Sequence, residues 1–113
     1  MYQSEEKDWK LYREKLPEWQ EAYMERLIRE YAELLNSDKA ASEKFWALDK
    51  RIRADRQSLG VRVIEEGRSK LQNILTGLII EHVISVDDLQ DFSEELREST
   101  SQWIQTYCKN LAE

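Results

Sequence analysis

The residues that most often do catalytic work in proteins are scarce in this chain. It has one histidine, His82, and one cysteine, Cys108. Cys108 has no basic run beside it that would favour a reactive thiolate, and His82 stands at the predicted end of a helix, where a capping role explains it. The sequence also lacks a glycine-rich phosphate loop, zinc-ligand spacing and a nucleophile elbow. We therefore expect neither an enzyme nor a cofactor, and no small-molecule substrate.

Acidic side chains recur at spacings of three and four toward the C-terminus, where they could be considered as metal ligands. They are Asp87, Asp91, Glu94, Glu95 and Glu98. A di-iron bundle needs Glu-x-x-His pairs whose carboxylates point into the core, and no glutamate stands three residues before His82. We therefore predict no metal site. The acidic stripe indicates a solvated helix face, or a face that docks a protein partner or mimics a polyanion.

Basic residues concentrate in one segment, residues 50–70, which carries a net charge of +4 between an N-terminal part at −4 and a C-terminal part at −6. Its basic side chains are Lys50, Arg51, Arg53, Arg56, Arg62, Arg68 and Lys70. Three interpretations stay open. The segment is a solvated helix surface, it pairs with carboxylates of the last helix or of another subunit, or it contacts nucleic acid.

The spacing of residues around Gly60 disfavours a DNA-binding helix-turn-helix motif. With Gly60 in the turn, Arg56 would occupy the position of a small residue, and Glu66 would occupy a buried one. A second register, LIIEHVISVDDLQDF, places apolar residues at the buried positions, namely Leu78, Ile84, Leu89 and Phe92. Its second helix is acidic and would repel phosphate groups. We expect this turn to serve packing alone.

The composition predicts the fold class. The chain has 113 residues, of which 41% are hydrophobic and 35% charged, and only three are Gly and one is Pro. This length and hydrophobic content are enough for one hydrophobic core. The Gly and Pro content is too low for the tight turns that many short strands would need. We predict an all-α fold, a four- to five-helix antiparallel bundle with long helices, in a single domain over residues 1–113.

Apolar residues at spacings of three and four predict where the helices lie. The predicted helices span residues 4–16, 17–35, 41–59 and 61–82, and a fifth starts at residue 85. Pro17 either begins the second helix or kinks one long helix, and we favour the break. Gly60 is the favoured stop of the third helix, although it could lie inside a helix that continues to His82. Ser85 to Asp88 resembles a capping box for the fifth helix.

Four tryptophans are distributed along these helices. Trp9, Trp19 and Trp103 lie on apolar faces, where we expect burial. Trp46 lies about 100° from the line of apolar residues on its helix. We favour core packing for Trp46, and a role as an anchor for a dimer or partner is the alternative.

The chain lacks the features of secreted and membrane proteins. A single cysteine cannot form an intramolecular disulfide, and the N-terminus MYQSEEKDW has no basic start or apolar run. The most apolar window, residues 74–84, is shorter than the ~20 residues that cross a bilayer. We expect a cytoplasmic protein without a membrane span.

Three segments carry a resemblance to a known group of proteins. SEKFWALDKRIRADRQSLGV, PEWQEAYMERL before it and ISVDDLQDFSEEL after it resemble small all-helical proteins of low-GC Gram-positive bacteria, some of which carry the label multidrug transporter. The resemblance covers most of the chain. The transporter label conflicts with the absence of a membrane-spanning stretch. The resemblance implies a cytosolic accessory or regulatory role.

These observations lead to one expected function. We expect a non-enzymatic protein–protein interaction or regulatory module that self-associates as a homodimer or binds a protein partner. The candidate interaction residues are Trp46, Lys50, Arg51, Arg53, Arg56, Arg62, Arg68, Asp87, Asp91, Glu95 and Glu98. The alternative is a nucleic-acid-associated regulatory factor that uses residues 50–70.

Overall fold

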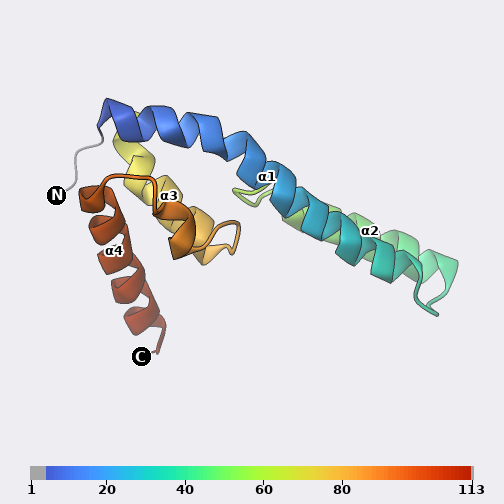
Figure 1. The fold of residues 1–113 in the computed structure, drawn as a ribbon. Helices are drawn as coiled ribbons and strands as arrows, with labels where there is room; N and C mark the ends of the chain where they lie inside the picture. Colours follow the sequence, from blue (N-terminus) through green and yellow to red (C-terminus); the bar gives the residue numbers. More distant parts are fainter. Residues whose placement is uncertain (1–4, 113) are drawn as a thin grey trace.

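A computed structural model describes residues 5–112 of the protein, and the side chains of residues 5–108. The elements follow the order α1 (Glu6–Leu35), α2 (Ala41–Asp55), η1 (Arg68–Lys70), α3 (Leu71–Ile80), η2 (Val86–Leu89) and α4 (Glu94–Ala112), where η marks a single 3₁₀ turn (Figure 1). No strand is present in this part of the chain. The all-α class is therefore confirmed, whereas the packing of the helices into one antiparallel bundle is not.

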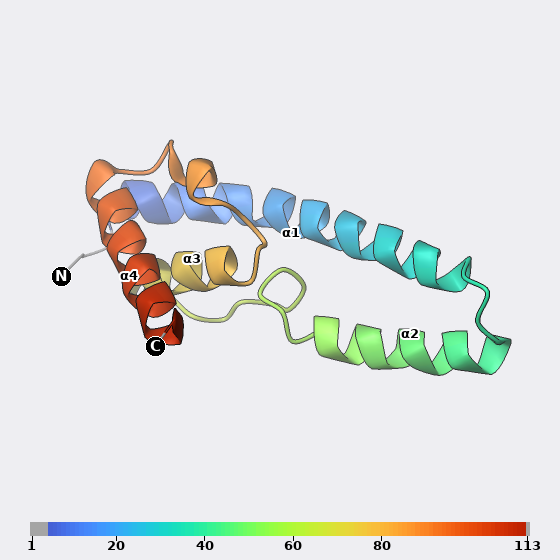
Figure 2. The same cartoon turned by 90° about the horizontal axis from the view of Figure 1, so that it is seen from below.

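The chain is elongated, with extents of 52 × 36 × 22 Å. Its radius of gyration is 16.8 Å, against about 13 Å for a compact domain of this length. The cause is a projecting arm, residues 24–56, in which α2 runs back alongside the second half of α1 (Figures 1 and 2). The remaining described residues, 5–23 and 57–112, form a body in which α3 and α4 pack beside the first half of α1.

Pro17 does not divide α1, so the favoured break is wrong and the alternative of one long helix is correct. Pro17 lies inside the 30-residue helix and on its exposed side. An interior proline costs roughly 3 kcal/mol because it removes a hydrogen bond and crowds the preceding turn. Packing on both sides of the proline offsets this cost, since Tyr12 is buried in the core before it and Trp19 packs against the core after it.

Gly60 does not end the third helix, because α2 ends at Asp55. The chain then makes a turn in which the Ser58 carbonyl accepts hydrogen bonds from the N–H groups of Val61 and Arg62. Gly60 is buried in this turn under the ring of Tyr23, where a Cβ atom would lie 2.2 Å from the ring carbon Cδ2. Close approach, rather than a left-handed backbone, is therefore the reason that a glycine stands here.

The predicted helix over residues 61–82 is also shorter than expected. The chain runs without helix from residue 63 to residue 67, turns once at η1, and is helical only through α3. In the non-helical stretch Ile64 packs on the core, whereas Val63 is exposed. One anchored side chain does not supply the apolar face from which most helices in proteins gain their stability.

The expected capping box at Ser85 is present, but it opens η2 rather than a long helix. The Asp88 carboxylate accepts hydrogen bonds from the Ser85 N–H at 2.7 Å and from its hydroxyl at 3.2 Å. The helix α4 starts eight residues later, after Ser93, whose hydroxyl accepts a hydrogen bond from the Leu96 N–H at 3.3 Å. The fifth helix was therefore predicted to start too early.

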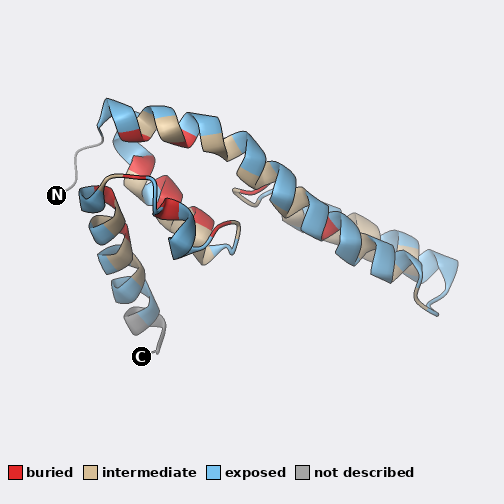
Figure 3. Ribbon diagram, in the orientation of Figure 1, coloured by how far each residue is buried: buried red, intermediate tan, exposed pale blue. Residues whose placement is uncertain are grey.

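The hydrophobic core lies in the body, between α3, α4 and the first half of α1 (Figure 3). Its buried members are Tyr12, Leu71, Ile74, Leu75, Leu78, Ile84, Leu89, Phe92 and Leu96. The four apolar positions of the second helix-turn-helix register are among them, as expected. Trp9 and Trp19 pack against this core, and the Trp19 and Phe92 ring centroids lie 6.2 Å apart. Burial therefore concentrates in one part of the molecule and leaves the arm largely exposed.

The expected burial of Trp103 is wrong, because its side chain is 55% exposed. It lies at the middle of α4, which has 19 residues, whereas its neighbour α3 has only 10. The longer helix thus extends past the shorter one, and its apolar side chains lose their cover there. Tyr107 is exposed for the same reason, and the side chain of Leu111 lies outside the described residues.

Candidate protein-interaction surface

The two helices of the arm are joined by one polar cluster around Arg51. Its guanidinium lies 3.5 Å from the Glu30 carboxylate of α1 and 3.7 Å from the Asp55 carboxylate of α2. It also lies over the Tyr31 ring, 5.4 Å from the ring centroid. The Tyr31 hydroxyl donates a hydrogen bond to Asp55. Arg51 thus contacts both helices and sets how they lie against each other.

The same cluster keeps Tyr31 protonated. Burial and the hydrogen bond to the Asp55 carboxylate raise the pKa of Tyr31 from 10.0 to about 12. The nearby Arg51 acts in the opposite direction but is the weaker influence. At neutral pH the hydroxyl is therefore a hydrogen-bond donor that holds Asp55 in place, rather than an acid that takes part in chemistry.

One side of the arm presents a row of apolar side chains that nothing in the described chain covers. We call it the open face and define it by Met24, Ile28 and Leu35 of α1 and by Phe45 and Ile52 of α2. Ile28 is 62% exposed and Phe45 64% exposed, and Leu35 and Ile52 are exposed as well. Between the two helices, a groove of about 210 Å³ is lined almost entirely by apolar atoms. Met24, Ile28 and Tyr31 line it on α1, and Ile52, Arg56 and Val61 line it on the other side.

Trp46 stands at the end of α2 that is farther from the body. The preferred interpretation, core packing, is wrong, because the side chain is 64% exposed. Its ring meets Phe45 edge to face, with the centroids 4.9 Å apart. The two rings form an exposed aromatic pair, which is a composition enriched in the energetically dominant parts of interfaces. A role for Trp46 as a partner anchor stays a prediction.

The basic residues of segment 50–70 do not come together on one surface. Arg51 and Arg53 pair with carboxylates of the arm, since Arg53 lies 3.0 Å from Asp49. Pairing with the last helix, one of the interpretations that the sequence left open, is not what these two residues show. Arg62 lies in the loop after α2 and pairs with Glu66 at 3.1 Å, which lowers the pKa of Glu66 below its usual value. Arg68 lies in η1, at the opposite end of the body from the arm. For Arg51, Arg53 and Arg62, pairing with carboxylates, one of the three interpretations, therefore occurs within or between neighbouring elements of the chain.

Lys50 and Arg53 of α2 and Arg56, which directly follows the helix, are all exposed. Arg56 follows Ile52 by one turn and borders the groove. On α1 the corresponding edge is acidic, because Glu25 of the arm lines one shallow surface together with Glu18 and Glu21, which lie just before the arm, and with Pro17 and Ala22. The open face thus has an acidic edge on α1 and a basic edge on α2.

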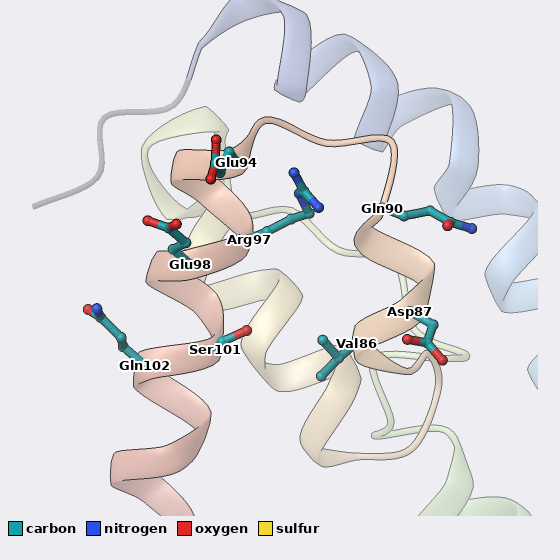
Figure 4. A pocket seen from close by; sticks show the side chains of 8 residues that line it. All are labelled: Val86, Asp87, Gln90, Glu94, Arg97, Glu98, Ser101 and Gln102. Carbon is teal, nitrogen blue, oxygen red and sulfur yellow. The ribbon is translucent and has the colours of Figure 1, made fainter.

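The predicted acidic stripe is exposed, but it is divided between η2, the loop after it, and α4. Asp91 pairs with Lys15 of α1 at 3.4 Å. The carboxylates of Asp87 and Glu98 lie at the rim of an open cleft of about 490 Å³ between η2 and α4. In this cleft the Arg97 side chain extends toward the segment that carries Gln90, and the Glu98 side chain points away from that segment (Figure 4).

The comparisons give this chain no relatives. No family model matches it, and no curated protein or solved structure is similar to it at a significant level. The resemblance to small helical proteins of Gram-positive bacteria therefore stays a prediction. Across the described residues, no helix has both the length and the apolar content needed to span a membrane. The same residues contain no group of three or more His, Cys, Asp or Glu side chains placed to hold a metal ion.

Proposed function

We propose that the protein is a non-enzymatic, cytoplasmic interaction module, and that it regulates or assembles with another protein chain through the open face of its arm. The observation that carries the proposal is the exposure of Ile28, Leu35, Phe45 and Ile52 on one side of two packed helices. Soluble chains rarely leave contiguous apolar patches open unless a partner covers them. The aromatic pair Phe45 and Trp46 would supply the anchors of such an interface.

The arm suits a partner that is itself helical. Its groove runs between two helices and has apolar walls, with Arg56 and Asp55 as polar groups in the lining. An amphipathic helix or helix pair lays its apolar side into such a groove and keeps its charged sides in water. With the partner in place, the arm would contribute two helices to an antiparallel bundle that is completed by helices of the partner.

A photo-crosslinking experiment tests the site. A photoreactive phenylalanine analogue replaces Phe45 in one protein and Trp103 in a second one, and both are irradiated inside the cells that naturally make the protein. The two positions are exposed aromatic residues, one in the arm and one in α4. We expect a discrete protein adduct from position 45 only, to be identified by mass spectrometry. Equal adducts at both positions, or none at position 45, would contradict the proposal.

Nucleic-acid association is the second candidate, and the exposed group Lys50, Arg53 and Arg56, in α2 and directly after it, supports it. If this group contacts phosphates, the affinity for a mixed pool of DNA and RNA falls steeply with salt. The affinity would also be lost when these three residues become Glu. Fluorescence anisotropy at low salt measures both effects, and absence of binding there removes this candidate.

A further inference from the structure

We propose that the partner on the open face is a second copy of this chain, so that two arms form an antiparallel four-helix bundle. The inference rests on the proposed function and names its partner. The two open faces meet about a two-fold axis that runs along the arms, and α1 of each copy lies against α2 of the other. Three observations support this arrangement: the spacing of apolar residues, the charges at the edges of the open face, and the position of the body.

The spacing of apolar residues gives α1 two neighbouring apolar seams. One seam contains Tyr23, Leu27 and Leu34, which are buried or half-buried. The other contains Met24, Ile28, Tyr31 and Leu35, at spacings of four, three and four, and belongs to the open side. In α2, the residues Phe45, Leu48 and Ile52 repeat the same alternation. Helices of four-helix bundles carry such repeats because each contacts more than one neighbour, and the single chain supplies only one neighbour here.

The charges at the edges of the open face decide how two arms would lie. Glu21 stands two turns before Ile28 and Glu25 about one turn before it, so the acidic edge of α1 borders its open seam. Arg56 and Arg53 border the open seam of α2 at the end nearer the body. If α1 lies against α2 of the other copy, acidic and basic edges meet twice. If α1 lies against α1 of the other copy, like charges meet, which disfavours that arrangement.

The body does not obstruct this pairing. Trp19 packs against Phe92 of the body, with 6.2 Å between the ring centroids. Ile28 lies nine residues further along α1, which at ~100° per residue places it about 180° from Trp19 around the helix axis. The hydrophobic core of the body and the open face therefore lie on opposite sides of α1. A second arm in the groove would meet the body at Val61, in the turn after α2, and not at the core.

The first experiment is sedimentation velocity on the full chain over a range of concentrations. We expect a species of twice the 13.5 kDa mass of one chain. The double substitution Ile28→Glu and Phe45→Glu is expected to give monomers with unchanged helical circular dichroism, because both side chains are exposed in the single chain. A wild-type chain that stays monomeric at several hundred micromolar overturns the inference. In that case, a specific adduct at position 45 with a different protein would still support the proposed function.

A charge exchange tests the arrangement itself. One chain carries Glu21→Arg and Glu25→Arg, and a second chain carries Arg53→Glu and Arg56→Glu. Each homodimer then has like charges at both contacts, and we expect its dissociation constant to rise by at least about tenfold. Mixed together, the two chains regain both attractive contacts and form a heterodimer, which native mass spectrometry detects.

A matched control carries Glu14→Arg and Glu98→Arg, two exposed charge reversals outside the arm, and is expected to dimerise like the wild type. Two other outcomes overturn the proposed pairing. One is a mixture that gains no heterodimer, and the other is a pair of variant homodimers as tight as the wild type.

Discussion

The carboxylate of Asp8, in the first turn of α1, is held by Ser93, 85 residues further along the chain. One carboxylate oxygen accepts a hydrogen bond from the Ser93 N–H at 2.9 Å, and the other accepts one from its hydroxyl at 2.6 Å. Asp8 is only 1% exposed. Since Ser93 also caps α4, this contact fixes the start of the last helix against the start of the first.

Replacing Asp8 by Asn is expected to destabilise the body. One of the two acceptor oxygens becomes an NH₂ group, which cannot accept the bond from Ser93, and the charge that strengthens the other bond is lost. We expect the free energy of unfolding to fall by about 1–3 kcal/mol, the range for a buried polar group left without its partner. Urea denaturation followed by tryptophan fluorescence measures this. Glu6→Gln, a change to an exposed residue two positions before Asp8, is the control, and an equal effect of both substitutions would contradict the role of Asp8.

A methyl group at Gly60 is expected to destabilise the protein, whereas one at Gly67 is not. A Cβ atom at Gly60 would lie 2.2 Å from the Tyr23 ring, and one at Gly67 has no atom within 4 Å. We expect Gly60→Ala to lower the free energy of unfolding by about 1–3 kcal/mol, as overpacking does, because the ring must move. Gly67→Ala is expected to be neutral or slightly stabilising, since it restricts the unfolded chain. Thermal denaturation compares the stability of the two variants. If Gly67→Ala were less stable than Gly60→Ala, the turn around Gly60 would accommodate a methyl group without strain.

The sequence predicted the core better than the helix ends. Leu78, Ile84, Leu89 and Phe92 are buried as their spacing indicates, because burial of apolar side chains is a property of the pattern itself. The helix ends depend on contacts between distant residues that no local pattern contains. Pro17 stays inside a helix because α1 packs on both sides of it, and α4 starts at Glu94 because Asp8 holds Ser93.

The candidate surface was predicted only in part. Exposure of Trp46 was one of two alternatives. The open face as a whole was missed, because periodic apolar residues in an amphipathic helix are ordinarily interpreted as the face that packs on the hydrophobic core. The pattern of apolar residues does not tell how many neighbouring helices each helix packs against. The α1 helix extends well beyond the short α3 helix, and only α2 accompanies its second half (Figure 2). A comparison of the expected helix lengths could have indicated that part of α1 has too few neighbours. The lengths of the third and fourth helices, however, were not predicted correctly.

Glycine in place of His82 is expected to stabilise the protein. His82 has a φ of 62°, in the left-handed region where a side chain is strained, and it follows the end of α3. Its side chain is exposed, and its carbonyl, which accepts a hydrogen bond from Arg26, is kept by the substitution. We expect a gain of up to about 1 kcal/mol. Gln90→Gly, at an exposed residue with a φ of −61°, is expected to lose stability in the same denaturation experiment. A loss of stability from both substitutions would contradict backbone strain at His82.

Stability is expected to fall at high pH because of two tyrosines. Burial raises the pKa of Tyr12 from 10.0 to about 12, and burial with the Asp55 hydrogen bond raises the pKa of Tyr31 similarly. Each contribution is fully present below pH 10, where both states keep the proton. It is lost between about pH 10 and 12, where only the unfolded chain releases the proton. Comparing urea denaturation of Tyr12→Phe with the wild type at pH 8 and pH 11 isolates one group. A wild type that is no more pH-sensitive than the variant would contradict the raised pKa.

Loss of Arg51 is expected to loosen the arm, whereas loss of Arg53 is not. Arg51 contacts Glu30 and Tyr31 on α1 and Asp55 on α2, but Arg53 pairs only with Asp49 on its own helix. Both are replaced by Met, which keeps an apolar stem of similar length and removes the charge. An exposed pair at spacing four is worth about 0.3–0.5 kcal/mol, so Arg53→Met should change little.

Arg51→Met removes a link between two helices and leaves the α2 amides to open independently of the body. Hydrogen exchange at low protein concentration measures this, since a dimer would protect the arm. We expect faster exchange in α2 for Arg51→Met and unchanged exchange in α3. Equal exchange in the two variants would mean that apolar contacts alone hold the arm together, and Arg51 would then remain available to a partner.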